Sequence, residues 1–188
     1  RRAAGMPTLD LARRLAGSPG RRLLGPEGLR LLAGIADESD PLDDEALALH
    51  EEVASLATGL AEHEEALARW SLVAERAETQ LRRASALLAA SRAAYALQRV
   101  SDARDLLGRS RELDSDNEVL RIEQLTHEAA ILLWLEMRTA EGRALAREAV
   151  AAATRLATGP GGIDALGEQA RRAYIDAIQR ARKMVWLT

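Results

Sequence analysis

The chain has 188 residues, a formal net charge of −3 and no cysteine, which excludes thiol catalysis, disulfide frameworks and thiolate metal sites. Lys183 is the only lysine among 26 basic residues, and the arginines are interleaved with acidic residues, so we expect no direct nucleic-acid binding. No apolar run approaches the roughly 18 residues that a membrane span needs and no signal peptide opens the chain, so we expect a cytoplasmic protein without membrane contact.

Helix-favouring residues dominate the composition. Hydrophobic residues make up 47% of the chain but aromatic residues only 3%, and alanine and leucine supply most of the apolar content. Both favour helices, whereas β-branched and aromatic residues are too sparse for a sheet. We therefore expect an all-α fold.

Residues 1–41 form the least regular part of the chain and predict an irregular N-terminal helical segment. Thr8 is suited to cap the first of two short helices, while the glycines and prolines of 17–20 and 25–28 predict turns. The two helices are expected over 9–15 and 29–36. Pro41 disfavours a helical residue before it, so a boundary is expected there.

Residues 42–158 predict three antiparallel helical hairpins. Their helices are expected over 43–57 and 61–77, over 80–97 and 101–113, and over 118–136 and 139–157. Asp43 suits the positive end of a helix dipole, and residues 114–117 supply both a stop and a helix cap. A glycine cluster at 159–162 ends the third hairpin, and 159–188 is expected to hold one further helix over 164–187, as a cap or the start of another repeat.

Small residues recur at matching places in the second helix of each hairpin. Ala66, Ala103 and Gly142 are separated by 37 and 39 residues. A small residue there allows two helices to approach closely, and two-helix units of this period are typical of stacked helical-repeat proteins. Most such proteins bind partners.

The second hairpin resembles the tetratricopeptide repeat. Residues 97–103, followed by Leu107 and the acidic turn at 113–117, reproduce its turn, its small residue early in the second helix and the large residue four positions later. The chain departs from that family in three places: Ser91 stands in place of glycine, Ala94 in place of an aromatic residue, and Ser115 in place of proline. The resemblance implies hairpins stacked as a right-handed superhelix, in a lengthened version of the repeat.

Residues 68–188 look more narrowly like the repeat region of bacterial LuxR-type large ATP-binding transcriptional regulators. In that family an ATPase module precedes the repeats and a helix-turn-helix module follows them. The chain begins with two arginines and stops inside a helical pattern, so we expect it to be a segment of a longer bacterial polypeptide.

Residue patterns for chemistry are weak. No phosphate-binding glycine loop is present, and the helical zinc-site pattern that begins at His63 and at His127 lacks its second histidine in both cases. The carboxylate pairs Glu51–Glu52 and Glu64–Glu65 are expected on helix surfaces, where their pKa values would not be tuned for catalysis. We expect no catalytic residue, no metal and no cofactor.

The concave wall of such a superhelix is lined by the first helix of each hairpin, which nominates candidate partner-binding residues. They are Glu51 and Ser55; Leu88, Arg92 and Tyr95; and Gln124, His127, Ile131 and Trp134. Arg92, Tyr95, His127 and Trp134 mix charge, hydrogen bonding and aromatic area, as binding hot spots do. The alternative is that Tyr95 and Trp134 pack between helices, as we expect for Trp70.

These observations lead to a non-enzymatic interaction or sensor domain within a bacterial transcriptional regulator. Its partner would be a protein, a peptide or a neighbouring domain of the same polypeptide. The alternative is a static adaptor of the tetratricopeptide type that binds a peptide in its concave groove.

Overall fold

The computed structural model describes residues 9–16, 18, 21–39, 43–113, 116–159 and 162–186, and within these ranges the chain is helical without strands. The all-α prediction is confirmed. The elements are α1 Leu9–Ala16, η1 Arg21–Leu24, α2 Gly25–Asp37, α3 Asp44–Gly59, α4 His63–Arg76, α5 Gln80–Ala96, α6 Val100–Glu112, α7 Glu118–Ala130, η2 Ile131–Leu135, α8 Thr139–Thr158, η3 Gly162–Ala165 and α9 Glu168–Trp186.

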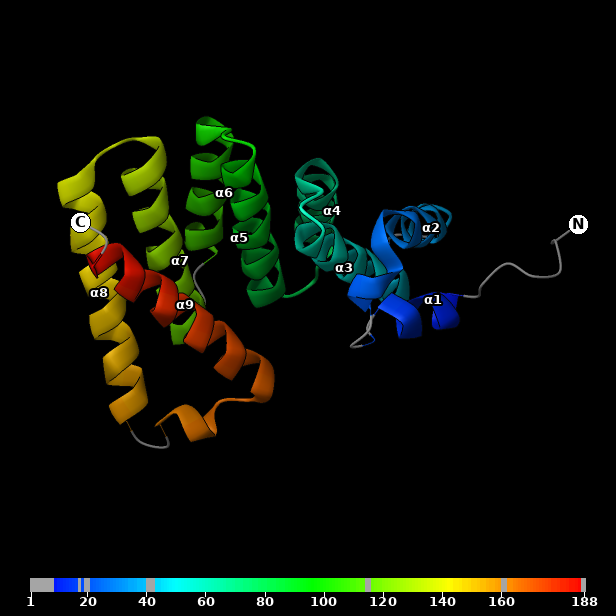
Figure 1. Cartoon of the computed structure of the whole chain (residues 1–188). Coiled ribbons are helices and arrows are strands. Elements are labelled where there is room, and N and C mark those ends of the chain that lie inside the picture. The colour runs from blue at the N-terminus through cyan, green and yellow to red at the C-terminus, as the bar shows by residue number, and fades with distance from the viewer. Residues whose placement is uncertain are drawn as a thin grey trace, which may run out of the picture.

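Three helical hairpins, α3/α4, α5/α6 and α7/α8, lie side by side in chain order (Figure 1). Each turn contains a non-glycine residue with positive φ: Ala61 at 61°, Gln98 at 59° and Met137 at 58°. These residues are separated by the same 37 and 39 positions as the small residues of the second helices. A left-handed residue is a common way to end a helix, so one turn geometry recurs in all three hairpins.

Side chains at the helix ends explain several boundaries. The Asp43 carboxylate accepts a hydrogen bond from the Glu45 amide at 2.9 Å, and the Asn117 side chain accepts one from the Leu120 amide at 3.0 Å. Both side chains are helix caps, because each accepts a hydrogen bond from a first-turn amide that has no partner within the helix. Thr79 caps α5 in the same way at 3.2 Å.

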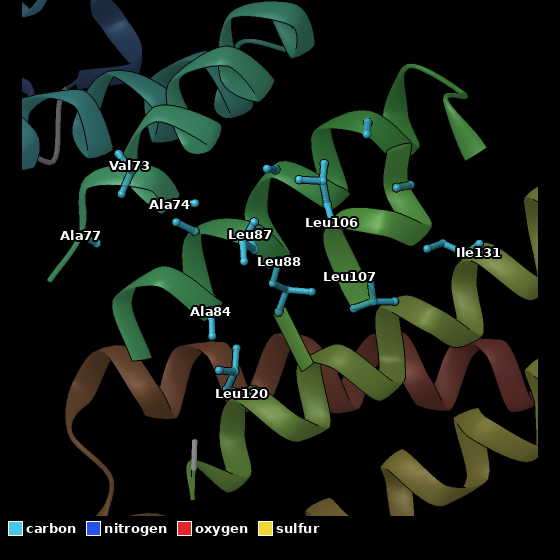
Figure 2. Packing of buried hydrophobic residues seen from close by; sticks show 14 of the residues in the cluster. Val73, Ala74, Ala77, Ala84, Leu87, Leu88, Leu106, Leu107, Leu120 and Ile131 are labelled. Carbon is cyan, nitrogen blue, oxygen red and sulfur yellow. The ribbon is translucent and has the colours of Figure 1, made fainter. Parts of the chain in front are cut away.

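The central core lies between α4, α5 and α6 (Figure 2). Leu87 and Leu88 of α5 pack with Leu106 and Leu107 of α6. Leu120 of α7 and Ile131 of η2 also belong to this core. A second group of buried residues joins α1 to α4, and further groups join α7, α8 and α9.

The last helix crosses obliquely over α7 and α8 and packs against both (Figure 1). Tyr174, Ala177, Ala181 and Met184 of α9 are buried at helical spacing. The Tyr174 hydroxyl donates to the Ala153 carbonyl at 2.9 Å, which fastens the start of α9 to α8. The described part of the N-terminal segment holds α1, η1 and α2, which cover α3.

Several expected boundaries are wrong. The turn expected at 25–28 is the start of α2, because Pro26 in the first helical turn needs no backbone donor. Ala61 lies in the turn and not in the helix. The helix expected to run to residue 136 changes to a π-helical turn over Ile131–Leu135, in which the Glu136 amide donates to the Ile131 carbonyl at 3.1 Å.

Some expectations fall on residues outside the described ranges. They are the cap at Thr8, most of the turn at 17–20, the boundary at Pro41, the first half of the turn at 114–117, the centre of the glycine cluster at 159–162 and the helix end at 187.

Candidate functional site

A pocket of about 470 Å³ opens where α5, α7 and α9 meet the end of α3. Its surface is predominantly apolar. Its lining residues are Thr58, Arg92, Tyr95, Thr126, His127, Ala130, Trp134, Arg180, Lys183 and Met184. The volume is within the range of small-molecule sites.

Four of the predicted partner-binding residues, Arg92, Tyr95, His127 and Trp134, line this one pocket. The Tyr95 and His127 rings meet edge to face, with centroids 5.6 Å apart and planes at 71°. This is a favourable geometry for two π systems. Trp134 lies on the π-helical turn with 51% of its surface exposed. Tyr95 therefore packs partly between helices and Trp134 stays accessible.

His127 is held by Ser91, which is fully buried. The Ser91 hydroxyl donates its hydrogen to the Ala103 carbonyl at 2.6 Å, and the same Oγ lies 2.9 Å from His127 Nε2. Because the hydroxyl has a single hydrogen, Nε2 is the donor of the second bond and Nδ1 carries a lone pair. Burial, and then the positive charges of Arg92 and Arg180, lower the pKa of His127 to about 3. The imidazole is neutral at physiological pH.

The cationic side chains of the pocket differ in their partners. Arg92 Nη2 donates to Glu123 Oε1 at 3.1 Å, while its buried Nε has no partner within the described part of the chain. Arg180 Nε donates to the Asp176 carbonyl of its own helix at 3.1 Å. Desolvation and the nearby charge of Arg92 lower the pKa of Arg180. The pocket wall is therefore electropositive.

The other two predicted residues lie outside the pocket. Glu51 forms an ion pair with Arg82 at 2.6 Å. Gln124 is only 8% exposed and its amide donates to the carbonyl and hydroxyl oxygens of Ser110, so it joins α7 to α6. Both side chains already have structural partners.

The three other residues that were expected to line the concave wall lie elsewhere in the structure. Leu88 and Ile131 are buried in the central core. Ser55 lines a smaller neighbouring pocket of about 290 Å³, which shares Thr58 and Arg92 with the first one. Trp70, expected in the core, also lines that smaller pocket while packing partly against the core.

Sequence reasoning missed the contribution of α9, namely Arg180, Lys183 and Met184. Their spacing places them on one side of a helix. However, the spacing does not predict that this helix crosses the first helices of the hairpins. The neighbouring buried positions Ala177 and Ala181 were the available signal, since they mark the inner face.

A second polar cluster surrounds Arg69 beside a cavity of about 420 Å³. Arg69 binds both carboxylate oxygens of Asp37, with its Nη2 2.8 Å from Oδ2, and its Nε donates to Glu65 at 2.7 Å. Arg69 Nη1 also lies 2.9 Å from His50 Nδ1, and burial lowers the pKa of His50. These groups satisfy one another, so the cluster fastens α2 onto α3 and α4.

Both members of the predicted Glu64–Glu65 pair form ion pairs with arginines. Glu64 pairs with Arg99 at 2.5 Å and Glu65 with Arg69, each as an interhelical or same-helix ion pair. Within the described ranges, no group of three or more histidine, aspartate or glutamate side chains is arranged to hold a metal ion. None of the described helices is both long and apolar enough to span a membrane.

Comparison of the chain with protein-family models, with curated proteins and with solved structures gives no match.

Proposed function

We propose that the chain is a non-enzymatic sensor domain of a larger bacterial transcriptional regulator, built as a tetratricopeptide-like superhelix that binds a ligand in the pocket between α5, α7 and α9. The observation that carries the proposal is the origin of the pocket walls. Arg92 and Tyr95 belong to the second hairpin, whereas His127 and Trp134 belong to the third. A ligand that contacts both walls changes the relative stability of different hairpin arrangements, as a sensor requires.

The repeated hairpin turn supports the superhelical part of the proposal. Residues with the same left-handed conformation occupy equivalent places at Ala61, Gln98 and Met137. Equivalent turns give equivalent hairpins, and stacking equivalent hairpins produces a solenoid in which each unit contacts its neighbours. In such an array, a contact made across one boundary alters the curvature of the whole array.

The position of α9 favours a sensor over a static peptide adaptor. Arg180, Lys183 and Met184 of this helix form one side of the pocket. An extended peptide lying along α3, α5 and α7 would have to pass this helix. A small molecule needs no such displacement.

A pocket-filling substitution tests the proposal. Ala130 lines the pocket, so Ala130→Trp should occlude it, whereas Ala140→Trp, at an exposed position of α8, is the matched control. A chemically broad small-molecule library is screened by ligand-detected NMR against the chain and both variants, after circular dichroism has verified their helicity. We expect hits that bind the chain and the control but not Ala130→Trp.

Small-angle scattering then separates a sensor from an adaptor. A saturating hit should change the scattering profile of the chain if ligand binding alters the curvature. An unchanged profile with intact binding would support the adaptor. A library without hits, or hits that bind Ala130→Trp equally well, would refute the proposed site.

A further inference from the structure

Three cationic side chains line the pocket and no acidic side chain does. Arg92 comes from α5, and Arg180 and Lys183 come from α9, so positive charge converges from two elements. Glu123 neutralises part of the charge of Arg92, but it is not among the lining residues. Among the described residues, no ion pair within 4.0 Å joins Arg180 or Lys183 to a carboxylate, and the charges of Glu123 and Asp176 act on Arg180 only from a greater distance.

Hydrogen-bond donors of the pocket are left without acceptors. Arg92 Nε is buried and unpaired within the described ranges, and the same part of the chain offers no acceptor to Lys183 Nζ or to the terminal nitrogens of Arg180. The Thr126 hydroxyl, by contrast, already donates to the Ile122 carbonyl at 2.7 Å. The buried, unpaired Arg92 Nε and the exposed cations Arg180 and Lys183 favour a ligand with charged oxygen atoms, because charge-assisted hydrogen bonds are the stronger ones.

The remaining wall is apolar and partly aromatic. Tyr95, Trp134, Ala130 and Met184 provide this surface. Aromatic and thioether side chains pack favourably against a flat apolar body. Neutral His127 adds an acceptor at Nδ1 rather than a further positive charge.

We infer that the ligand of this pocket is a small organic anion, a carboxylate or a phosphate monoester, with an apolar and preferably aromatic body. Arg180 and Lys183 bind the anionic group together with Arg92, and Tyr95 and Trp134 contact the body. The inference rests on the proposed function, since it names the ligand class of the same pocket.

Probe pairs that share one naphthyl body test the charge of the ligand. 2-Naphthoate is compared with 2-naphthamide, and 2-naphthyl phosphate with 2-naphthol, by isothermal titration calorimetry on the full chain. We expect each anion to bind at least about tenfold more tightly than its neutral partner, which is the effect of roughly one charge-assisted hydrogen bond. The tighter of the two anions identifies the preferred group. Raising the salt concentration should weaken only the anions.

A double substitution on α9 tests the assigned cations. Arg180→Gln with Lys183→Gln should weaken anion binding about tenfold or more and leave the neutral probes unchanged. Arg172→Gln with Arg182→Gln removes the same charge from exposed positions of the same helix outside the pocket, and should change affinity less than twofold.

The outcomes separate the ligand class from the site itself. If the neutral probes bind as tightly as the anions, or if the pocket variant binds anions normally, the anion assignment is overturned. In either case, loss of binding in Ala130→Trp would still support the proposed pocket. If no probe binds but library hits still bind the chain and not Ala130→Trp, only the ligand class is refuted. If neither the probes nor the library hits bind, both the ligand class and the proposed function are refuted.

Discussion

Ser91 joins three helices through one hydroxyl group. Its Oγ donates to the Ala103 carbonyl of α6 and accepts from His127 of α7, and Ser110 makes a related pair of contacts with the Ala84 carbonyl and Gln124. The second hairpin is thus bound to α7 at two points through serines. The hydroxyl of Ser91 therefore has a structural role.

Removal of the Ser91 hydroxyl should destabilise the fold. Ser91→Ala leaves the buried His127 Nε2–H without a partner and removes a second donor from the Ala103 carbonyl, and an unsatisfied buried group of this kind costs about 1–3 kcal/mol. Urea unfolding followed by circular dichroism measures the change. Ser101→Ala, at an exposed position of α6, is the control and should change stability by less than about 0.5 kcal/mol. Equal effects of the two substitutions would contradict the role of Ser91.

The buried His127 should make stability depend on pH. Its pKa is about 3 in the folded chain and 6.5 ordinarily, so between these values the unfolded chain binds more protons and the free energy of unfolding rises with pH. Wild type should therefore lose about 2 kcal/mol more than His127→Gln between pH 7 and pH 5. Urea titrations at both pH values measure this difference. Burial also lowers the pKa of His50, but that contribution cancels in the comparison. Equal losses in the two proteins would mean that His127 is already accessible to protons.

At the scale of the helices, Gly142 sets the distance between α8 and the end of α7. A Cβ atom at this position would lie 2.6 Å from Leu133 Cγ and 3.1 Å from the Ala129 carbonyl oxygen. Ala66 and Ala103, the equivalent residues of the other hairpins, are fully buried. The third hairpin is therefore packed too closely there for even a methyl group.

Two glycine substitutions with the same chemistry should have opposite effects. Gly142→Ala should lower stability by about 1–3 kcal/mol, because overpacking exceeds the better helix propensity of alanine. Gly108→Ala in α6 should raise stability by about 0.5–1 kcal/mol, since no atom lies within 4 Å of the added carbon. Thermal unfolding of both variants provides the measurement. Stabilisation by Gly142→Ala would show that the helices can separate without loss.

Helix periodicity and the repeat pattern predicted most of the hairpin helices. They also predicted Arg92, Tyr95, His127 and Trp134 as partner-binding residues, and these four line one pocket. They could not predict the local change at Ile131–Leu135, because a π-helical turn has the same residue preferences as the helix that it interrupts. The pocket positions of Arg180 and Lys183 could not be predicted for a different reason. Spacing identifies the face of a helix, but the angle at which α9 crosses its neighbours is set by tertiary packing.

At the scale of the whole molecule, the boundary between α5/α6 and α7 is unusually polar. Three ion pairs cross it: Arg92 with Glu123 at 3.1 Å, Arg104 with Glu136 at 3.0 Å and Arg111 with Glu128 at 2.5 Å. Within the described ranges, Leu120 and Ile131 are the two buried residues of the third hairpin that join the central core; both are labelled in Figure 2. Because polar contacts rather than a large shared apolar core join the hairpins here, the proposed function predicts that they move at this boundary when a ligand binds.

Two isoleucines of the third hairpin distinguish this boundary from the packing behind it. Ile131 and Ile122 are both about 1% exposed, but Ile131 packs into the central core and Ile122 packs with Tyr174 and Ala177 of α9. Truncation of either residue to alanine removes the same buried atoms, at a cost of about 2–5 kcal/mol. Because local opening follows the weakest packed boundary, each variant should loosen a different part of the chain.

Hydrogen exchange measured by mass spectrometry locates the loosened part. Ile131→Ala should accelerate exchange mainly in α6 and in the segment from the end of α7 through the π-helical turn, while α9 keeps most of its protection. Ile122→Ala should accelerate exchange mainly in α9. Identical exchange patterns in the two variants would show that the hairpins open as a single cooperative unit, and a ligand bound across the pocket could then not act by moving one hairpin against another.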